Sequence, residues 1–352
     1  MNSGINYIDL FSGIGGFHLG ILNAGIKINK SFYSDISKYA NIVYKKHFNQ
    51  SIELGDVKNI TKETIIEKTD GELPKIDLVT FGFPCQDLSI AGKGLGFDGK
   101  RSSLFFEAIR IIQELQPDYF IFENVKGLLQ YSGGKAFELV LQEISNIGYD
   151  GQWQLVNTSW FLPQNRERIY FVGYNRRTIK SPPKIFPITK PNRCIVKIQP
   201  KTKAEQDRIF NKISQDNRKN ELLESGRRSK GRFNSNKNSG LNQIISSVSQ
   251  SYRVYGLDGN SITLTSNTGG IGARTGLYAV NKETNKNKYN LDKGIYNHKY
   301  NIRRLTPIEC ERLQGFPDNW TSDLSDTQRY RCLGNAVSVP VVEEIIRRLY
   351  NN

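Results

Sequence analysis

The chain has 352 residues, more than one hydrophobic core comfortably accommodates, so we expect one large domain and one smaller domain. A net charge of +15, with 49 Lys and Arg among 17 Tyr and 18 Phe, favours a polyanionic partner such as nucleic acid; the alternative is a soluble basic protein from a Lys- and Asn-rich proteome. The 4 cysteines lie far apart and there are only 3 histidines, which argues against a disulfide framework and against a metal site.

The most apolar stretch near the N-terminus runs from residue 7 to residue 26. It is interrupted by Asp9 and by several glycines, so it resembles neither a signal peptide nor a membrane span. We therefore expect a cytoplasmic protein without a membrane partner.

Up to about residue 175, short apolar runs alternate with amphipathic stretches, as in strand and helix repeats around a parallel sheet. Helices are predicted over 104–112 and 137–148, where apolar residues recur on one face. The predicted strands are 7–11, 28–34, 77–83, 119–123 and 168–173.

Beyond residue 175 the composition changes. Residues 200–240 are basic and poor in apolar side chains, which indicates a partly flexible insertion. Short antiparallel strands are predicted at 252–255, 262–265 and 277–280, a capped helix at 307–314 and a last helix at 337–349. This pattern divides the chain into a larger α/β domain, 1–176 with 328–352, and a smaller β-rich domain, 177–327.

The first loop, residues 9–17, follows a strand and opens a helix, and its glycines allow a ligand to approach the backbone. It matches a dinucleotide fingerprint imperfectly, because His18 stands where Gly or Ala is usual. A different adenosine-containing ligand is therefore open, as is a plain tight turn. Asp35 at the next strand end can accept from ribose hydroxyls, and Asp56 from an adenine amino group; each alone is more often a solvated loop acid.

Three further segments carry reactive groups. Cys85 follows Pro84 at a strand end beside a Gly- and Lys-rich loop, which favours an exposed nucleophilic thiol over a small buried hydrophobe. Glu123 closes an apolar run, where burial would raise its pKa and favour a proton donor; the alternative is a carboxylate held by an Arg or Lys. Arg166 and Arg168 alternate on one extended segment, so they are expected to share a face that holds a carbonyl oxygen, a phosphate or the glutamate.

In order along the chain, segments 9–17, 82–89, 122–125, 164–170, 304–317 and 334–337 resemble those of bacterial DNA (cytosine-5)-methyltransferases. The resemblance covers nearly the full length. It implies a Rossmann-like S-adenosylmethionine-dependent methyltransferase core, with a mostly parallel sheet and helices on both faces, plus a smaller β-rich target-recognition domain.

The resemblance also implies residue roles. Cys85 would be the nucleophile, Glu123 the partner of cytosine N3 and Arg168 the ligand of the ring oxygen, with Arg166 and Asn124 supporting. The S-adenosylmethionine pocket would comprise Phe11, Gly13, Ile14, Gly16, Asp35, Ile36, Asp56, Val57, Leu104, Asn335 and Val337. Ser89 and Gln250 would fill the gap left by the flipped base. Apart from the resemblance, the Gly- and Thr-rich stretch 262–276, with Thr263, Arg274 and the nearby Arg253, is where we expect DNA contacts; the alternative is a plain β-hairpin with solvated turns. The family usually has Glu at position 35 and Trp at position 36, so the departures here concern cofactor affinity.

The chemistry is consistent with these residue types. Addition of a thiolate at C6 turns cytosine into an enamine whose C5 can attack an electrophilic methyl group, once the base is flipped out of the duplex. We therefore expect a monomeric enzyme of the bacterial cytoplasm that acts on double-stranded DNA, as the modification half of a restriction-modification pair whose endonuclease acts on the same site without contact. A transfer RNA methyltransferase, a nicotinamide-dependent oxidoreductase and a catalytically silent DNA-binding protein are the alternatives.

Overall fold

The computed structural model describes residues 4–83, 104–189, 243–245, 254–255, 260–266, 274–281 and 300–351. Cys85, Ser89, Gln250 and Arg253 and the basic segment 200–240 lie outside the described residues. The chain forms two compact units. The first unit is Met1–Thr158, Glu167–Pro191 and Ala336–Asn352, and the second unit is Ser159–Arg166 and Asn192–Asn335.

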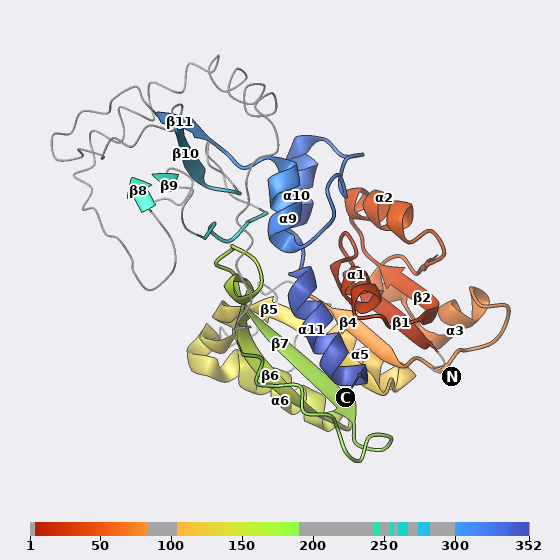
Figure 1. The fold of residues 1–352 in the computed structure, drawn as a ribbon. Coiled ribbons are helices and arrows are strands. Elements are labelled where there is room, and N and C mark those ends of the chain that lie inside the picture. Colours follow the sequence, from red (N-terminus) through yellow and green to blue (C-terminus); the bar gives the residue numbers. More distant parts are fainter. Residues whose placement is uncertain are drawn as a thin grey trace. The chain divides into compact units, whose positions relative to one another are not determined.

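A seven-stranded sheet forms the centre of the first unit, with the order β3-β2-β1-β4-β5-β7-β6 (Figure 1). The strands are β1 (Ile5–Leu10), β2 (Ile28–Ser34), β3 (Ile52–Glu53), β4 (Leu78–Phe81), β5 (Tyr119–Val125), β6 (Tyr149–Asn157) and β7 (Glu167–Asn175). The first five of these pair in parallel, whereas β7 runs antiparallel to both β5 and β6. The mostly parallel, Rossmann-like sheet predicted from the sequence is confirmed.

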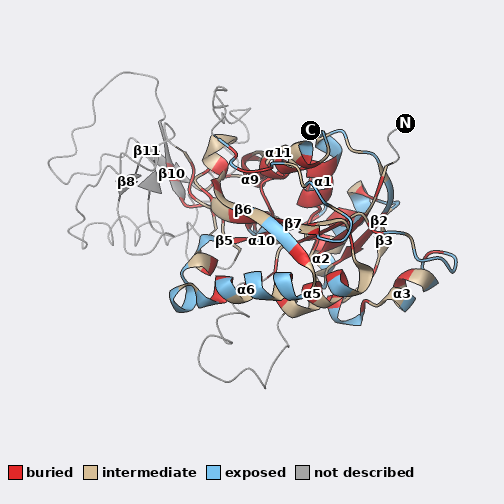
Figure 2. Cartoon of the chain, turned by 90° about the horizontal axis from the view of Figure 1, so that it is seen from below, coloured by how far each residue is buried: buried red, intermediate tan, exposed pale blue. Residues whose placement is uncertain are grey.

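Helices cover both faces of this sheet. The helices α1 (Gly16–Asn23) and α11 (Val339–Tyr350) lie against one face, and α5 (Leu104–Leu115) and α6 (Lys135–Asn146) against the other (Figure 1, Figure 2). The remaining helices of this unit are α2 (Lys38–His47) and α3 (Lys62–Glu67), with the short 3-10 turns η1 (Val57–Asn59), η2 (Lys126–Leu129), η3 (Tyr131–Gly134) and η4 (Thr158–Trp160). Because both faces are covered, β4 is buried at every residue, as is usual for central parallel strands.

The register of the central strands aligns their carboxyl ends. Leu10 of β1 pairs with Ser34 of β2 and with Phe81 of β4, and Phe81 pairs with Phe122 of β5. The segments that follow these residues therefore leave the sheet along one edge, where ligands of open parallel sheets bind.

In the second unit, four short strands have the order β11-β10-β9-β8. They are β8 (Gln243–Ile245), β9 (Val254–Tyr255), β10 (Leu277–Asn281) and β11 (Tyr300–Arg303). The predicted all-antiparallel arrangement is wrong at one pair, because β9 and β10 are parallel. Residues 262–265, predicted as a strand, have no strand assignment; Ser261 instead makes an isolated bridge to Gln164.

The helices α9 (Pro307–Gln314) and α10 (Asp326–Asn335) complete the described second unit. The predicted capping box of α9 is confirmed: Thr306 Oγ1 accepts from Glu309 N at 3.1 Å, and Glu309 Oε2 accepts from Thr306 N at 2.8 Å. Gly315 ends the helix at φ 86°, a left-handed conformation that glycine adopts without strain.

No helix in the described part of the chain has the length and apolarity needed to cross a membrane. Within that same part, no group of three or more His, Cys, Asp or Glu side chains is arranged to hold a metal ion.

A cluster of aromatic rings packs beneath the first loop. His18 of α1 stacks on Phe48 with ring centroids 3.8 Å apart, and its Nδ1 shares a 2.9 Å hydrogen bond with the Tyr44 hydroxyl. A Cβ at Gly15 would fall on the Phe48 ring. The loop therefore rests directly on aromatic side chains, and burial lowers the pKa of His18 to about 4.

This burial predicts a dependence of stability on pH. The pKa of His18 is about 4 in the folded protein against 6.5 for an ordinary histidine, so the unfolded chain binds more protons between these pH values. The free energy of unfolding should therefore fall by about 3 kcal/mol as the pH is lowered from 6.5 towards 4, because protonation of His18 then favours the unfolded chain. His18→Phe keeps an aromatic ring without a titrating group. Urea unfolding from pH 4 to pH 7 should show a smaller decline towards acid pH in this variant than in the wild type; equal declines would contradict the assignment.

Candidate active site

The first loop has the backbone geometry of a tight ligand-binding turn. After β1, Phe11, Gly13 and Gly15 adopt positive φ values of 53°, 54° and 82°, and α1 begins at Gly16. A positive φ is strained for a residue such as phenylalanine, so Phe11 is held in place by its surroundings. Ser12 N donates to Ser34 O at 3.0 Å, which ties the loop to the end of β2.

Asp35 joins this loop to the start of α2. Its Oδ2 accepts from Gly13 N at 2.9 Å and its Oδ1 accepts from Ser37 N at 2.7 Å. Burial raises the pKa of Asp35, and hydrogen bonds from the backbone of Ser37, Gly13 and Ile36 oppose that shift. Because each carboxylate oxygen can accept more than one hydrogen bond, Asp35 can hold the loop and also receive ligand hydroxyls.

Asp56 and Val57 lie on the segment after β3. The Asp56 side chain caps η1 by accepting from Lys58 N at 3.1 Å, and Ser34 Oγ donates to Gly55 O at 2.6 Å, which ties this segment to the end of β2. Val57 is buried in the core, and Arg110 of α5 donates to its carbonyl at 3.2 Å. Asp35 directly follows Ser34, the last residue of β2, and Gly55, which precedes Asp56, is hydrogen-bonded to Ser34. Both aspartates therefore lie on segments at the end of β2.

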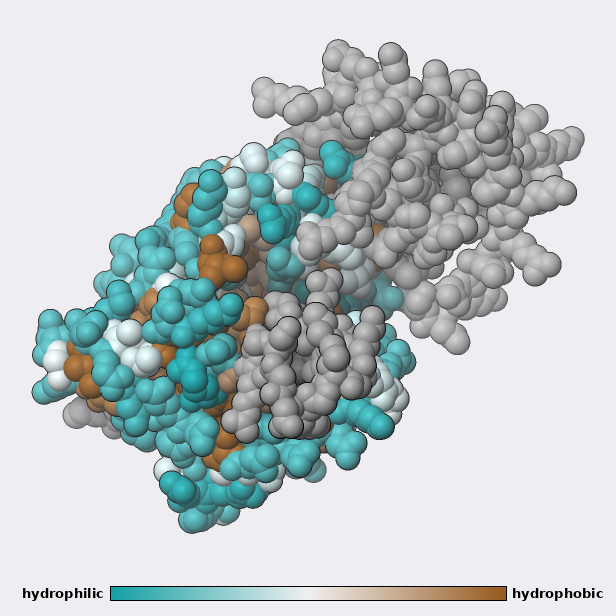
Figure 3. Space-filling view, turned by 180° about the vertical axis from the view of Figure 1, so that it is seen from behind, coloured by the Kyte–Doolittle hydropathy of each residue, from teal (hydrophilic) through white to brown (hydrophobic). Residues whose placement is uncertain are grey.

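The other predicted cofactor residues differ in exposure. Ile14, Gly16 and Val337 are buried, Phe11 and Leu104 are half-buried against the core, and Ile36 is 80% exposed. All of these belong to the first unit, whereas Asn335 is the exposed last residue of α10 in the second unit. On the face shown in Figure 3, the described surface is mostly hydrophilic with small apolar groups. Among the exposed large apolar side chains of the described residues, Ile36 has the highest exposed fraction.

Glu123 and Arg168 form a nearly buried ion pair. Arg168 Nε lies 3.0 Å from Glu123 Oε1, and the two side chains are 13% and 10% exposed. The antiparallel pairing of β5 with β7 sets Val125 opposite Arg168, so Arg168 and Glu123 are diagonal neighbours. The structure therefore shows the carboxylate held by an arginine, which was the alternative to an unpaired carboxyl group in an apolar pocket.

The same strand end anchors the segment that leads to Cys85. A Cβ added at Gly82 would lie 3.7 Å from Glu123 Oε2, and Asn124 Nδ2 donates to Phe83 O at 3.0 Å. Asn124 Oδ1 also accepts from Val125 N at 2.8 Å, which fixes the orientation of the amide. The last described residues before Cys85 are thus in contact with Glu123 and Asn124.

Arg166 lies just outside the strand that carries Arg168, and the common face of the two side chains stays a prediction. The strand β7 begins at Glu167, and Arg166 belongs to the second unit. Its buried guanidinium donates through Nη1 to Leu264 O at 3.1 Å and to Gly334 O at 3.4 Å. Two buried backbone carbonyls need donors, which a planar guanidinium supplies together.

Two of the predicted DNA contacts are within the described residues. Thr263 Oγ1 donates to Asn165 O at 2.6 Å, and Arg274, at φ 76°, donates through Nη1 to Thr327 O at 2.6 Å. Both side chains therefore make hydrogen bonds within the second unit, and their DNA contacts stay predictions.

The sequence interpretation missed two buried polar residues. Asp9 of β1 is fully buried, accepts from Thr80 Oγ1 at 2.8 Å, and has a raised pKa chiefly because of burial. Gln164 is also fully buried and donates through Nε2 to Leu313 O at 2.8 Å. An acidic residue inside the apolar run Tyr7–Phe11 was the available signal for Asp9, whereas Gln164 offers none without its tertiary partners.

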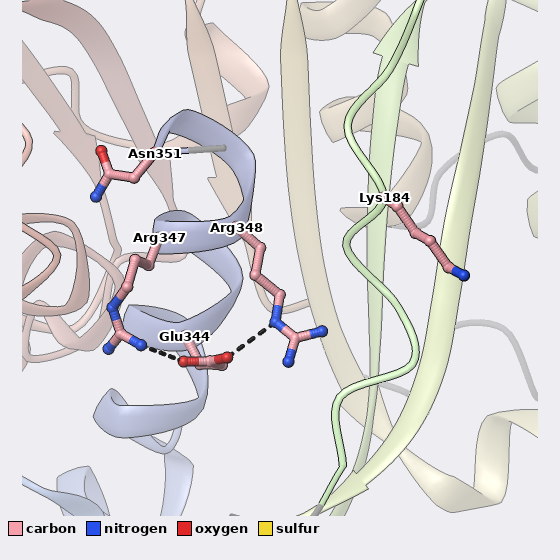
Figure 4. Close-up of a pocket in the computed structure, with 5 residues that line it drawn as sticks. All are labelled: Lys184, Glu344, Arg347, Arg348 and Asn351. Carbon is pink, nitrogen blue, oxygen red and sulfur yellow. Dashed lines mark hydrogen bonds and ion pairs between the residues drawn. The ribbon is translucent and has the colours of Figure 1, made fainter.

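A separate cavity of about 430 Å³ lies on α11 and the segment that faces it. It is lined by Lys184, Glu344, Arg347, Arg348 and Asn351 (Figure 4). None of the predicted site residues lines it. Arg348 pairs with Glu344 and donates to the carbonyls of Ile185 and Pro187, both at 2.9 Å, so it anchors α11 on this segment.

The Rossmann-like sheet, the glycine turn after β1 and the acidic residue after β2 have the geometry of proteins that bind nucleotide-type ligands at this edge of the sheet. The family model "C-5 cytosine-specific DNA methylase" matches residues 5–351, and the chain belongs to this family.

Curated relatives extend over nearly the whole chain. The type II methyltransferase M.NgoBI of Neisseria gonorrhoeae is 33% identical and covers 96% of this chain and 90% of its own length. The type II methyltransferase M.HhaI of Haemophilus parahaemolyticus is 31% identical, with coverage of 97% and 93%. The solved structure of Entamoeba histolytica methyltransferase EhMeth has a TM-score of 0.67 at 19% identity and covers 99% of both chains, which supports the fold. The enzyme is a DNA (cytosine-5)-methyltransferase.

The ion pair predicts a coupling in stability. Arg168→Met leaves the Glu123 carboxylate in a nearly buried site without its partner, which should lower the free energy of unfolding by about 3 kcal/mol. In Glu123→Gln/Arg168→Met both charges are absent, so the double variant should be more stable than the sum of the single changes predicts, by about 1–3 kcal/mol. Equilibrium urea unfolding of the wild type and the three variants measures this coupling. Strict additivity would show that the pair contributes nothing.

Proposed function

We propose that this enzyme transfers the methyl group of S-adenosylmethionine to C5 of a cytosine flipped out of duplex DNA, with Cys85 as the nucleophile. The observation that carries the proposal is the Glu123–Arg168 pair, with Nε and Oε1 at 3.0 Å, beside Gly82, three residues before Cys85 in the chain. A carboxyl group and a guanidinium at this position match the two polar edges of cytosine that become charged when a thiolate adds to the ring.

The first unit has groups that fit the methyl donor. The left-handed turn at Phe11, Gly13 and Gly15 brings the backbone close to a ligand, and Asp35 retains accepting capacity for ribose hydroxyls. S-adenosylmethionine supplies an electrophilic methyl group when bound. Asp56 and Val57 would hold the adenine, with Ile36 and Leu104 as apolar neighbours. The shorter Asp35 and the absence of an aromatic ring at Ile36 favour a weaker grip than in family members with Glu and Trp there.

The nucleophilic step needs two groups besides the thiolate. Addition of the Cys85 sulfur to C6 pushes electrons towards N3 and O2 of the ring. Glu123 would hold a proton at N3, and Arg168, which uses Nε for Glu123 and Nη1 for Glu167 O, would neutralise charge at O2. When C5 takes the methyl group, S-adenosylhomocysteine is left as the second product. Transfer of the C5 proton to water and departure of the Cys85 sulfur as a thiolate then restore the aromatic ring.

The biological setting follows from the relatives. Several of them are named type II methyltransferases, which supports a modification enzyme of a restriction-modification pair acting on DNA in the bacterial cytoplasm. Target recognition would lie in the second unit, with Ser89, Gln250, Arg253, Thr263 and Arg274 as contacts. The net charge of +15 supports duplex binding through phosphates.

Cys85→Ala tests the nucleophile. The variant should bind duplex DNA with about wild-type affinity, yet it should incorporate no labelled methyl and form no denaturation-resistant conjugate with 5-fluorocytosine DNA, because no thiolate is present to attack C6. Incorporation is measured with labelled methyl donor on duplex DNA and, in parallel, on transfer RNA. Transfer by the variant would remove the nucleophile assignment, and label in transfer RNA alone would favour the alternative substrate.

Glu123→Gln tests the proton donor. The amide is nearly isosteric but cannot deliver a proton to N3, so turnover should fall about 100-fold or more while binding of the methyl donor stays within about threefold. Single-turnover rates and equilibrium titration of the donor separate the two effects. Wild-type turnover in this variant would contradict the assigned role.

A further inference from the structure

The chain crosses between the two units after Thr158, Arg166, Pro191 and Asn335. Two of these crossings lead directly to site residues. Residue 167 opens β7, which carries Arg168, and residue 336 leads to Val337 and α11. Contacts that fix the backbone just before residues 167 and 336 therefore influence where Arg168 and Val337 lie.

Within the second unit, the guanidinium of Arg166 links the backbone just before residue 167 to the backbone just before residue 336. Arg166, the last residue before the first crossing, donates from Nη1 and Nη2 to the carbonyl of Gly334, the penultimate residue before the second, each at 3.4 Å. Its Nη1 also donates to Leu264 O at 3.1 Å. Arg166 is 2% exposed, so these hydrogen bonds are shielded from water.

The same tie includes the segment 261–265, part of the stretch predicted to contact DNA. Asn165 N donates to Ser261 O at 2.8 Å, and Ser261 N donates to Pro163 O at 2.7 Å. Leu264 N donates to Gln164 Oε1 at 3.3 Å. Residues 163–166 and 261–265 therefore lie side by side, with hydrogen bonds along most of their length.

Gly334 closes the arrangement from the other side. A Cβ at this position would fall on the backbone of Thr265 and Ser266, so the end of α10 and the segment 261–265 are in backbone contact. Any larger residue at position 334 must push that segment away.

We propose that Arg166 is a positioning residue that couples the recognition segment 261–265 to the two crossings leading to Arg168 and Val337. The inference rests on the proposed function, because it assumes that the second unit holds the target DNA. Without the hydrogen bonds of Arg166, the segment 261–265 and the residues that lead into Arg168 and Val337 would no longer be held to each other. Lysine cannot replace arginine here, because one ammonium group lacks the planar fork that reaches two carbonyls.

Arg166→Lys in the full-length enzyme is the direct test. The target duplex is first taken from a bisulfite map of DNA from cells that express the wild type. The variant should lose about 10- to 100-fold in kcat, because misplacement of Arg168 acts on the reacting geometry. The ratio of rates on the target duplex and on a duplex with one changed base pair should fall about tenfold, a change that simple destabilisation does not produce.

The chain offers matched controls. Arg348 lies on α11 of the first unit (Figure 4). It also donates to two backbone carbonyls, those of Ile185 and Pro187, so Arg348→Lys makes the same chemical change elsewhere. Gly334→Ala is a second test, because its added methyl group pushes against the segment 261–265 and removes no polar group. Gly151→Ala is the matched control for it, because its methyl group would clash with the Phe171 ring in the first unit. The two controls, Arg348→Lys and Gly151→Ala, should keep kcat and the rate ratio within about twofold of the wild type. Gly334→Ala should instead lose activity and discrimination as Arg166→Lys does.

The outcomes separate the two proposals. An active wild type with unchanged kcat and rate ratio in both Arg166→Lys and Gly334→Ala overturns the coupling alone. Equal losses in Arg166→Lys and Arg348→Lys, with the rate ratio unchanged, also overturn it, because they show general destabilisation. A wild type that methylates no duplex DNA overturns the proposed function together with the inference. If Arg166→Lys does not fold, Gly334→Ala decides the result.

Discussion

The antiparallel strand β7 inside a mostly parallel sheet is the constraint on which the site depends. It lies between β5 and β6 and places Arg168 diagonally from Glu123, at 3.0 Å. Both side chains are nearly buried, so water screens their attraction weakly and each compensates the charge of the other. The register that sets Val125 opposite Arg168 is what brings Arg168 to Glu123.

The carboxyl ends of β1, β2, β4 and β5 supply the rest of the chemistry in the first unit. Their register brings the glycine turn, Asp35, the Gly82–Phe83 pair and Glu123 to one edge of the sheet. Hydrogen bonds then fix the polar groups: Asp35 accepts from Gly13 N and Asn124 donates to Phe83 O. Preorganisation of this kind lets a site act on a ligand without first rearranging.

Buried polar side chains organise the described part of the second unit. Glu311 of α9 is fully buried and accepts from Asn319 N at 2.7 Å, Thr321 N at 2.9 Å and Arg329 Nη2 at 2.9 Å. It thus holds the turn between α9 and α10, as Arg166 and Gln164 hold the segment 261–265. Hydrogen-bonded networks of this kind favour one conformation where irregular backbone offers few regular hydrogen bonds.

The sequence by itself determined the local elements and the family. The parallel sheet follows from alternating apolar runs, the start and end of α9 from its capping box and Gly315, and the family from six ordered segments, because these depend on residues close together in the chain. Tertiary structure alone decided the partners: that Arg168 pairs with Glu123, that Arg166 turns to Leu264 and Gly334, that β9 and β10 run parallel, and that His18 stacks on Phe48. Such partners are far apart in sequence, and packing rather than local preference selects them.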